Sequence, residues 1–328
     1  LPSWATIMLG VGKPSSGAAT PENATSIRLS SASTSSVSQI RTWYYQITVR
    51  FCSKCSYMFE RCVVDVRFVA VFIVCFLASL LGPLCGIGGG VIIKPVVDAM
   101  GVMGVGAVSF LSSVSVLVMS LSTLVQNACT RSSSIDSRSL MPIAVGSAVG
   151  GVAGKVAFNQ MIAALPNADL VGAAQAAVLI VFSVLVLIYT LNKDRIAGVE
   201  LRGAAPQALA GFLAGACWSF LGIGGGPFNL AILVFFFSME SKTAAQASLF
   251  IIAFSQTASL VYTLVSGSVP DFSLIVLVGM CLMAVMGSVV GRKLSKRMDS
   301  STIDRLYVFA LLLIIAISLY NFARFAIL

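Results

Sequence analysis

Apolar runs of nearly constant length fill the sequence from about residue 63 to its end. Crossing the roughly 30 Å hydrocarbon core of a bilayer takes about 20 apolar residues in a helix, and about eight runs approach that length. They lie at about 63–85, 105–127, 140–162, 170–191, 206–221 continuing through 227–238, 243–266, 272–291 and 306–327. Because lipid offers no hydrogen-bond partners, runs of this length must be helical to pair their backbone groups. The sequence therefore predicts an all-α membrane protein with about eight transmembrane segments.

The charged residues exclude several other classes of protein. Only 10% of the residues are charged, whereas soluble domains carry about a quarter. The net charge of +9 comes from Lys and Arg scattered through short loops, as the positive-inside rule predicts, and not from a basic stripe that would bind nucleic acid. No His is present, which excludes Ser-His-Asp and Cys-His catalysis and imidazole metal ligands. We therefore expect no enzyme, no cofactor and no nucleic-acid partner.

Residues 1–62 differ from the rest of the chain. They are rich in Ser, Thr and Ala without periodicity, which is typical of a disordered tail, and they lack the features of a signal peptide. The first residue is Leu, as expected for a fragment or a misassigned start. Cys52, Cys55 and Cys62 have a spacing that suits a metal or a disulfide, or they are incidental thiols of the tail. Since no second pair and no His accompany them, we expect no metal site.

A five-residue motif, Gly-Ile-Gly-Gly-Gly, occurs at 86–90 and again at 222–226. We call the separation of the two copies, from Gly86 to Gly222, the repeat offset. Two later pairs of segments also match, 108–125 with 247–264, which sets Ser109 against Ser248, and 150–155 with 287–292. Self-similarity of this kind indicates internal repeats. We predict two transmembrane repeats of four segments each, 63–191 and 204–328, joined by a basic cytoplasmic linker at 192–203.

The two glycine motifs interrupt the apolar runs in which they lie. Each glycine destabilises a helix by about 1 kcal/mol relative to Ala, so four in five residues cannot continue one. Unpaired backbone groups are strongly unfavourable in lipid, and the breaks must therefore be buried in protein or line a watery cavity. A nucleotide-binding loop is excluded because Val91 and Pro227 stand where its last glycine belongs, and neither copy has the Gly-Lys-Ser/Thr of a phosphate-binding loop.

Each broken segment either crosses the membrane or forms a hairpin that enters and leaves on one side. Full crossings divide the basic residues without bias, whereas hairpins gather most of them on one face, as the positive-inside rule favours. These are Arg131, Arg138, Lys193, Arg195, Arg202, Lys242, Arg292, Lys293, Lys296, Arg297 and Arg305. The short arms 91–100 and 227–238 reach about half a bilayer, although the first arm, 63–85, is long for a hairpin. With hairpins, the second repeat is inverted relative to the first, and the two breaks meet near the midplane.

Other small residues in the apolar runs are assigned to packing. Gly146 with Gly150, and Gly287 with Gly291, have the spacing of closely packed membrane helices. The cysteines within the membrane runs are interpreted as small apolar side chains, with a role of Cys85 in handling sulfur as an alternative.

A short helix begins at each break, where free backbone amides and the positive end of the helix dipole attract anions. Glycine lets a ligand approach the backbone without an intervening side chain. We therefore predict a substrate site for a small anion that combines the motif glycines with nearby polar donors. The predicted substrate-binding residues are Gly86, Gly88, Gly89, Gly90, Lys94, Ser109, Gly222, Gly224, Gly225, Gly226, Asn229 and Ser248.

Most of the polar residues near the breaks have two interpretations. Lys94 binds the substrate or extends its ammonium group to the membrane interface. Asn229 binds the substrate or ties helix backbones together. Asp98 and Glu240 carry a coupling proton or are charges at loop ends in water. Four further side chains are predicted to line the substrate path, Ser109, Ser112, Ser248 and Gln256. The alternative for the three serines is a hydrogen bond to a carbonyl oxygen of their own helix.

Together these features resemble the sulfite exporter TauE/SafE family. The resemblance rests on the doubled GIGGG, Pro95 after the first copy, the Ser-containing helix that follows, and the later helix with a Gly pair and a basic residue, and it covers about 63–328. It implies a multi-pass permease that moves small sulfur-containing anions such as sulfite and organosulfonates, usually by export. Lys94 at a normally apolar position, and Ala231 where the first copy has its proline, depart from the family pattern.

We therefore predict a secondary transporter of a small anion, sulfite or an organosulfonate, in the plasma membrane, with the substrate and the lipid bilayer as its partners. An anion channel is one alternative, and it predicts flux that neither saturates nor needs a gradient of a second ion. A non-transport scaffold or accessory subunit is the other. In a scaffold the glycines only allow close packing, so replacing Gly89 or Gly225 by Ala harms folding and transport together.

Overall fold

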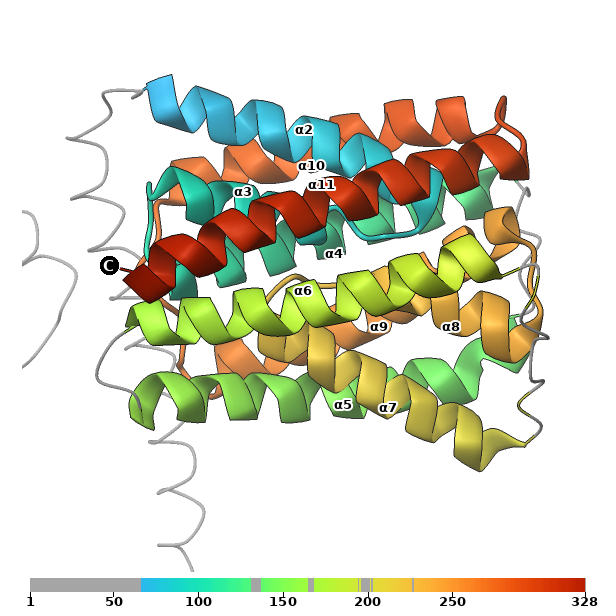
Figure 1. Ribbon diagram of the computed structural model, residues 1–328, viewed down its shortest axis with the longest axis horizontal. Helices are drawn as coiled ribbons and strands as arrows, with labels where there is room; N and C mark the ends of the chain where they lie inside the picture. Colours follow the sequence, from blue (N-terminus) through green and yellow to red (C-terminus); the bar gives the residue numbers. More distant parts are fainter. Residues whose placement is uncertain are drawn as a thin grey trace, which may run out of the picture. The chain divides into compact units, whose positions relative to one another are not determined.

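The computed structural model describes residues 66–130, 137–164, 168–193, 195, 201, 203–225 and 227–327 of the chain. The predicted tail with its three cysteines, Gly226 and most of the predicted linker 192–203 lie outside the described residues. The described chain contains ten helices and no strand (Figure 1). The helices are α2 (Val66–Cys85), α3 (Gly90–Met100), α4 (Val105–Cys129), α5 (Ser137–Ala164), α6 (Ala168–Asn192), α7 (Ala204–Leu221), α8 (Pro227–Phe237), α9 (Ser241–Val265), α10 (Leu274–Ser295) and α11 (Ser300–Ile327).

Eight of these helices are long and apolar enough to cross a bilayer, and α3 and α8 are the two short ones. Large apolar side chains are exposed along their outer faces, for example at the regular spacing of Val69, Ile73 and Leu77 on α2. Such a stripe suits contact with the apolar hydrocarbon chains of the lipid. The prediction of an all-α chain with about eight transmembrane segments is confirmed. The protein is an integral, multi-pass membrane protein.

The first glycine break separates α2 and α3, which form a hairpin. A side chain at Gly279, near the start of α10, would touch Phe72 near the start of α2. At the end of α3, Arg324 of α11 donates a hydrogen bond to the carbonyl oxygen of Ala99 at 2.7 Å. Since α10 and α11 are joined by a short connection, the start of α10 and the end of α11 lie at the same end of the bundle. Both arms of this hairpin therefore open at that end (Figure 1).

The second break separates α7 and α8, which form a hairpin from the opposite end (Figure 1). Helix α7 runs parallel to α5, because Gly146 and Gly154 of α5 face Ala208 and Ala216 of α7 in that order. The end of α8 returns to the start of α7, where the Leu201 amide donates to the Phe236 carbonyl oxygen at 2.9 Å. The two hairpins thus enter the bundle from opposite ends. The division into two inverted repeats of four segments stays a prediction, as do the predicted domain boundaries.

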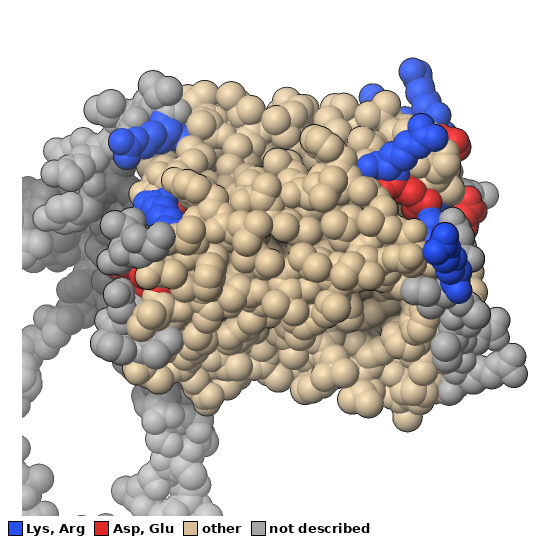
Figure 2. Space-filling model, viewed as in Figure 1, with Lys and Arg blue, Asp and Glu red and all other residues tan. Residues whose placement is uncertain are grey.

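The basic residues gather at the end where the second hairpin opens. Of the predicted basic face, the described connections and helix ends on this side carry Lys193, Arg195, Lys242, Arg292, Lys293, Lys296, Arg297 and Arg305. Charged side chains appear at the two ends of the bundle in Figure 2, and the middle of the face shown is uncharged. The positive-inside rule assigns the more basic end to the cytoplasm. We call it the basic end below.

Glycines allow the hairpins to pack closely against their neighbours. A Cβ at Gly150 of α5 would lie 2.0 Å from the Phe212 carbonyl oxygen of α7. A Cβ at Gly291 of α10 would lie 2.2 Å from the Leu80 carbonyl oxygen of α2. Both distances are far below van der Waals contact, so these helices approach backbone to backbone as small residues permit. The packing role predicted for the glycine pairs of α5 and α10 is confirmed.

Candidate functional site

The two glycine breaks touch each other inside the bundle. A Cβ added to Gly90 would lie 1.9 Å from the carbonyl oxygen of Ile223, and one added to Gly88 would lie 3.6 Å from the Cα of Gly225. The turn at the first break needs positive φ at Gly88, with a value of 69°, as the second does at Gly224, with a value of 72°. Only glycine adopts such angles readily. The predicted meeting of the two breaks is therefore present in the structure.

A serine from each half braces the break of the other half. Ser112 of α4 donates a 2.7 Å hydrogen bond to the Gly222 carbonyl oxygen, and Ser248 of α9 donates to the Gly86 carbonyl oxygen. The two serines are separated by the repeat offset, as are the two glycines that they contact. The predicted match of Ser109 with Ser248 is therefore wrong by one helical turn.

Ser109 instead packs directly on the first glycine of the second break. A Cβ at Gly222 would lie 2.5 Å from the Ser109 Cβ, and Ala245 has the equivalent position against Gly86. The Ser109 hydroxyl is fully buried and has no hydrogen-bond partner among the described residues. Of the two predicted serines, Ser248 therefore uses its hydroxyl in a hydrogen bond to a backbone carbonyl oxygen. The Ser109 hydroxyl stays available beside a glycine break.

The backbone amides at the start of α3 are partly used within the turn. The amides of Val91 and Ile92 donate to the carbonyl oxygens of Gly88 and Gly89, at 3.2 and 3.1 Å. Helix α8 begins at Pro227, which has no amide hydrogen to leave unpaired and therefore suits the first position of a helix. Since both short helices point their positive ends toward the contact of the breaks, this region favours a negative charge.

Lys94 and Asp98 form a buried ion pair on one face of α3. The Lys94 Nζ lies 2.7 Å from the Asp98 Oδ2, and the two residues are only 4% and 7% exposed. The interpretation of Asp98 as a loop-end charge in water is wrong, because α3 continues to Met100 and α11 covers this turn. The Lys94 ammonium does not reach the membrane interface either. Its charge is balanced on its own helix.

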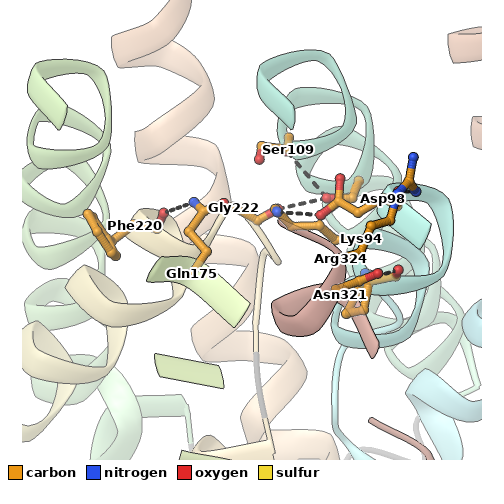
Figure 3. A network of polar contacts seen from close by, with 10 residues as sticks. Lys94, Asp98, Ser109, Gln175, Phe220, Gly222, Asn321 and Arg324 are labelled. Atoms are coloured by element: carbon orange, nitrogen blue, oxygen red, sulfur yellow. Dashed lines mark hydrogen bonds and ion pairs between the residues drawn. The ribbon is translucent and has the colours of Figure 1, made fainter. Parts of the chain in front are cut away.

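A small cavity of about 20 Å³ lies against this ion pair, and its lining includes the side chains of Gln175, Asn321 and Ser318. The buried Ser318 hydroxyl has no partner among the described residues. Gln175 of α6 donates its amide to the Phe220 carbonyl oxygen at 2.6 Å, and Asn321 of α11 donates to the Pro95 carbonyl oxygen at 2.7 Å. These bonds fix the two amide groups (Figure 3). The Oε1 of Gln175, the Oδ1 of Asn321 and the Oδ1 of Asp98 then have no partner among the described residues. We call this space the acceptor cavity.

A second cavity, of about 10 Å³, lies against Lys155 of α5, and its lining includes the Gln256 amide and several hydroxyl groups. Lys155 is only 6% exposed. The described part of the chain places no carboxylate within ion-pair distance of Lys155, and its ammonium lies 4.9 Å from the centre of the Phe158 ring. The described lining residues of this cavity are Phe110, Ser113, Lys155, Ser219, Gln256, Ser259, Leu260 and Thr263. We call this space the donor cavity.

Gln256 of α9 connects the donor cavity to the second glycine break. Its side chain is 2% exposed, and its Nε2 has no hydrogen-bond partner among the described residues. A Cβ on Gly224 would lie 3.4 Å from the Gln256 amide carbon. Beside it, the Ser219 and Ser259 hydroxyls share a 2.7 Å hydrogen bond. An ammonium, an amide donor and a hydroxyl pair thus border one space next to a break.

The other predicted residues have structural partners. Asn229 accepts a 2.9 Å hydrogen bond from the Trp218 indole, which ties α8 to α7. Glu240 is exposed at the basic end and accepts a hydrogen bond from Ser300. Cys85 is fully buried in the apolar core. The structure describes no cluster of His, Cys, Asp and Glu that could hold a metal ion within the residues it covers.

Lys155 is absent from the predicted site. In the sequence it follows Gly154 at the end of a small-residue segment, in the same way that Arg292 follows Gly291. Arg292, however, lies at the basic end and donates to the Asn127 side chain at 2.6 Å. The available signal was a lone lysine inside an apolar run, since intramembrane charges are rare and functional by default.

Comparison with known proteins gives one match. The model of the family described as sulfite exporter TauE/SafE matches residues 71–319, from within α2 to within α11. The match covers more than half of the chain and includes both glycine breaks and all the lining residues of the donor cavity. Asn321 and Phe325 of the acceptor cavity follow it. No curated protein and no solved structure gives a significant match.

Proposed function

The chain belongs to the sulfite exporter TauE/SafE family, and from this premise we propose that it is a secondary transporter of a small sulfur-containing anion, sulfite or an organosulfonate. The family is one of membrane transporters, which fits the eight long apolar helices. The observation that carries the proposal is the contact between two glycine-broken hairpins that enter from opposite ends. Broken helices that meet inside a bundle form the substrate sites of many secondary transporters.

We further propose that the two halves are inverted repeats. Equivalent contacts recur at the repeat offset on the hairpin side. Phe76 and Leu80 of α2 lie against two glycines of α10, and Phe212 and Ala216 of α7 lie against two glycines of α5. The glycines are Gly287 and Gly291 of α10, and Gly150 and Gly154 of α5. Two similar halves of opposite orientation give a bundle two equivalent ways to open, one toward each side of the membrane. This is the property that alternating access requires.

An anion is the substrate that suits the centre of this bundle. Two short helices direct their positive dipole ends toward the contact of the breaks. Lys155 adds a buried positive charge that no carboxylate balances within the described residues. The cavities are small, at about 20 and 10 Å³, which favours a transporter that must change conformation over a permanently open anion channel. The scaffold alternative gives no reason for a buried, unbalanced ammonium group.

The test is uptake of radiolabelled sulfite and sulfoacetate into proteoliposomes that contain the purified chain, with and without a proton gradient. We expect saturable uptake in the wild type. The Gly225→Ala variant should lose it, because the new Cβ would lie 2.5 Å from Ile252 Cδ1 at the meeting point of the breaks. Gly104→Ala is the matched control, since nothing lies within 4 Å of its Cβ position.

The outcome separates the candidate functions. Uptake that rises linearly with anion concentration would favour the channel. If the folded wild type takes up neither anion, the proposed substrate class is wrong, although the fold and the family membership stand.

A further inference from the structure

Resting on the proposed transport function, we propose that the donor cavity is the anion-binding site and that Lys155 and Gln256 are its principal ligands. The predicted site centred on the glycine backbone and Lys94, but the Lys94 charge is already paired with Asp98, whereas no carboxylate among the described residues pairs with Lys155. The ligand class is a sulfite or sulfonate group, in which three oxygens share the negative charge.

The charge of Lys155 is the first observation behind this proposal. A buried ammonium group is strongly unfavourable unless a counter-charge or several hydrogen bonds compensate it. At 6% exposure Lys155 has only the ring of Phe158 as a described partner. A bound anion would supply the missing counter-charge, and binding there would gain from the low dielectric of the interior.

The second observation is independent of the charge. The Gln256 Nε2 is a buried donor without a partner among the described residues, and leaving such a group unpaired is destabilising. It borders the same cavity as Lys155. Two different kinds of donor therefore face one space, and an anion is the ligand that satisfies both.

The hydroxyls match the third oxygen of a sulfite or sulfonate group. In the Ser219 and Ser259 pair one hydroxyl donates to the other, which leaves one O–H free to donate to a ligand. The Thr263 hydroxyl donates to the Ser259 carbonyl oxygen and is therefore not a free donor. The cavity thus offers an ammonium, an amide and one hydroxyl, on α5, α9 and either α7 or α9.

The position of the cavity fits a transport path. It begins at Gln256 beside Gly224 of the second break, and its lining ends at Thr263, near the end of α9 away from the basic end. An anion here lies between the contact of the breaks and the less basic side of the membrane. With a volume of about 10 Å³ the cavity has room for about one water molecule, so the anion enters when the surrounding helices move apart.

The test measures concentration-dependent uptake of sulfoacetate by the full chain in proteoliposomes. We compare the wild type with Lys155→Gln, Lys155→Arg and Gln256→Leu, and use Lys296→Gln as the matched control, because Lys296 lies outside the membrane-spanning helices at the basic end. Lys155→Gln should raise the half-saturating concentration about tenfold or more, as loss of a charge-assisted hydrogen bond brings. Lys155→Arg should restore part of the affinity, and the control should match the wild type.

A second measurement keeps failure of the site and failure of the function apart. Thermal unfolding of the same variants in detergent, with and without sulfoacetate or sulfite, reports binding without transport. If the wild type is stabilised by the anion and Lys155→Gln is not, the site stands even when no uptake is seen. If Lys155→Gln keeps the wild-type half-saturating concentration, or the same stabilisation by the anion, the proposed site is wrong.

Discussion

The two buried lysines of the bundle differ in what surrounds them. Lys94 has a carboxylate 2.7 Å away and a cavity whose unpartnered atoms are three acceptor oxygens and the Ser318 hydroxyl. Lys155 has no carboxylate partner within the described chain and a cavity that contains an orphaned donor. Burial of a lysine therefore does not identify an anion site by itself. The groups around it decide whether the charge belongs to the fold or is left for a ligand.

The two halves of the chain are alike in their hairpin contacts and differ in the polar side chains of their cavities. The contacts that position the hairpins recur at the repeat offset, as with Ser112 and Ser248. The polar residues of the cavities have unlike equivalents, since Lys94 corresponds to Leu230 and Gln256 to Ser120. Lys155 corresponds in sequence to Arg292, which lies at the basic end and contacts Asn127. If the halves are repeats as proposed, similar hairpin contacts thus accompany unlike polar side chains. The acceptor cavity borders a balanced ion pair, and the donor cavity borders an ammonium group without a carboxylate partner among the described residues.

The largest expected difference between the lysines is in stability. Lys94→Met leaves Asp98 as a buried charge without its partner, which should lower the free energy of unfolding by about 3–5 kcal/mol. Lys155→Met removes an unbalanced charge and should leave stability equal to or above that of the wild type. Chemical denaturation of the purified variants in detergent measures both. Equal losses in the two variants would show that Lys155 also has a structural partner.

A double-mutant cycle should sharpen this contrast. Because Lys94 and Asp98 stabilise each other, the double variant Lys94→Met with Asp98→Leu should be more stable than the sum of the single losses predicts, with a coupling of about 2 kcal/mol. The pair Lys155→Met and Gln256→Leu, measured without anion, should couple by less than about 0.5 kcal/mol. Coupling of similar size in both cycles would remove the distinction between the cavities.

The shared scaffold predicts similar effects of equivalent substitutions. Ser112→Ala and Ser248→Ala each remove a buried hydrogen bond to a glycine carbonyl of the opposite break. Each should lower the free energy of unfolding by about 1–2 kcal/mol, and the two values should agree closely. The same denaturation assay measures them, with Ser301→Ala, near the start of α11 at the basic end, as control. A large effect in only one of the two would argue against inverted repeats.

The fold could be predicted from the sequence because its signals are local. Apolar runs gave the helices, and the distribution of Lys and Arg favoured the hairpins that the structure contains. Asp98 was misplaced because what buries it comes from α11, the last helix of the chain, where Arg324 covers the end of α3. Lys155 was missed although it lies inside the apolar run 140–162, because the sequence match paired it with Arg292, which lies at the basic end. Side-chain partners between distant helices leave no local pattern in a single sequence.

The smallest expected effect is the most direct comparison of the two cavities. A ligand that binds only the folded state stabilises it according to its concentration, by about 1.4 kcal/mol at ten times the dissociation constant. Sulfoacetate should therefore stabilise the wild type by this amount and Lys155→Met by much less. In Asp98→Asn, a change that keeps the Lys94 ammonium but removes its counter-charge, the acceptor cavity gains an unbalanced positive charge. If the groups around a buried lysine decide its role, this variant should bind a second anion there. At high anion concentration its stability should then rise about twice as steeply with the logarithm of the concentration as that of the wild type, because each site contributes its own increment.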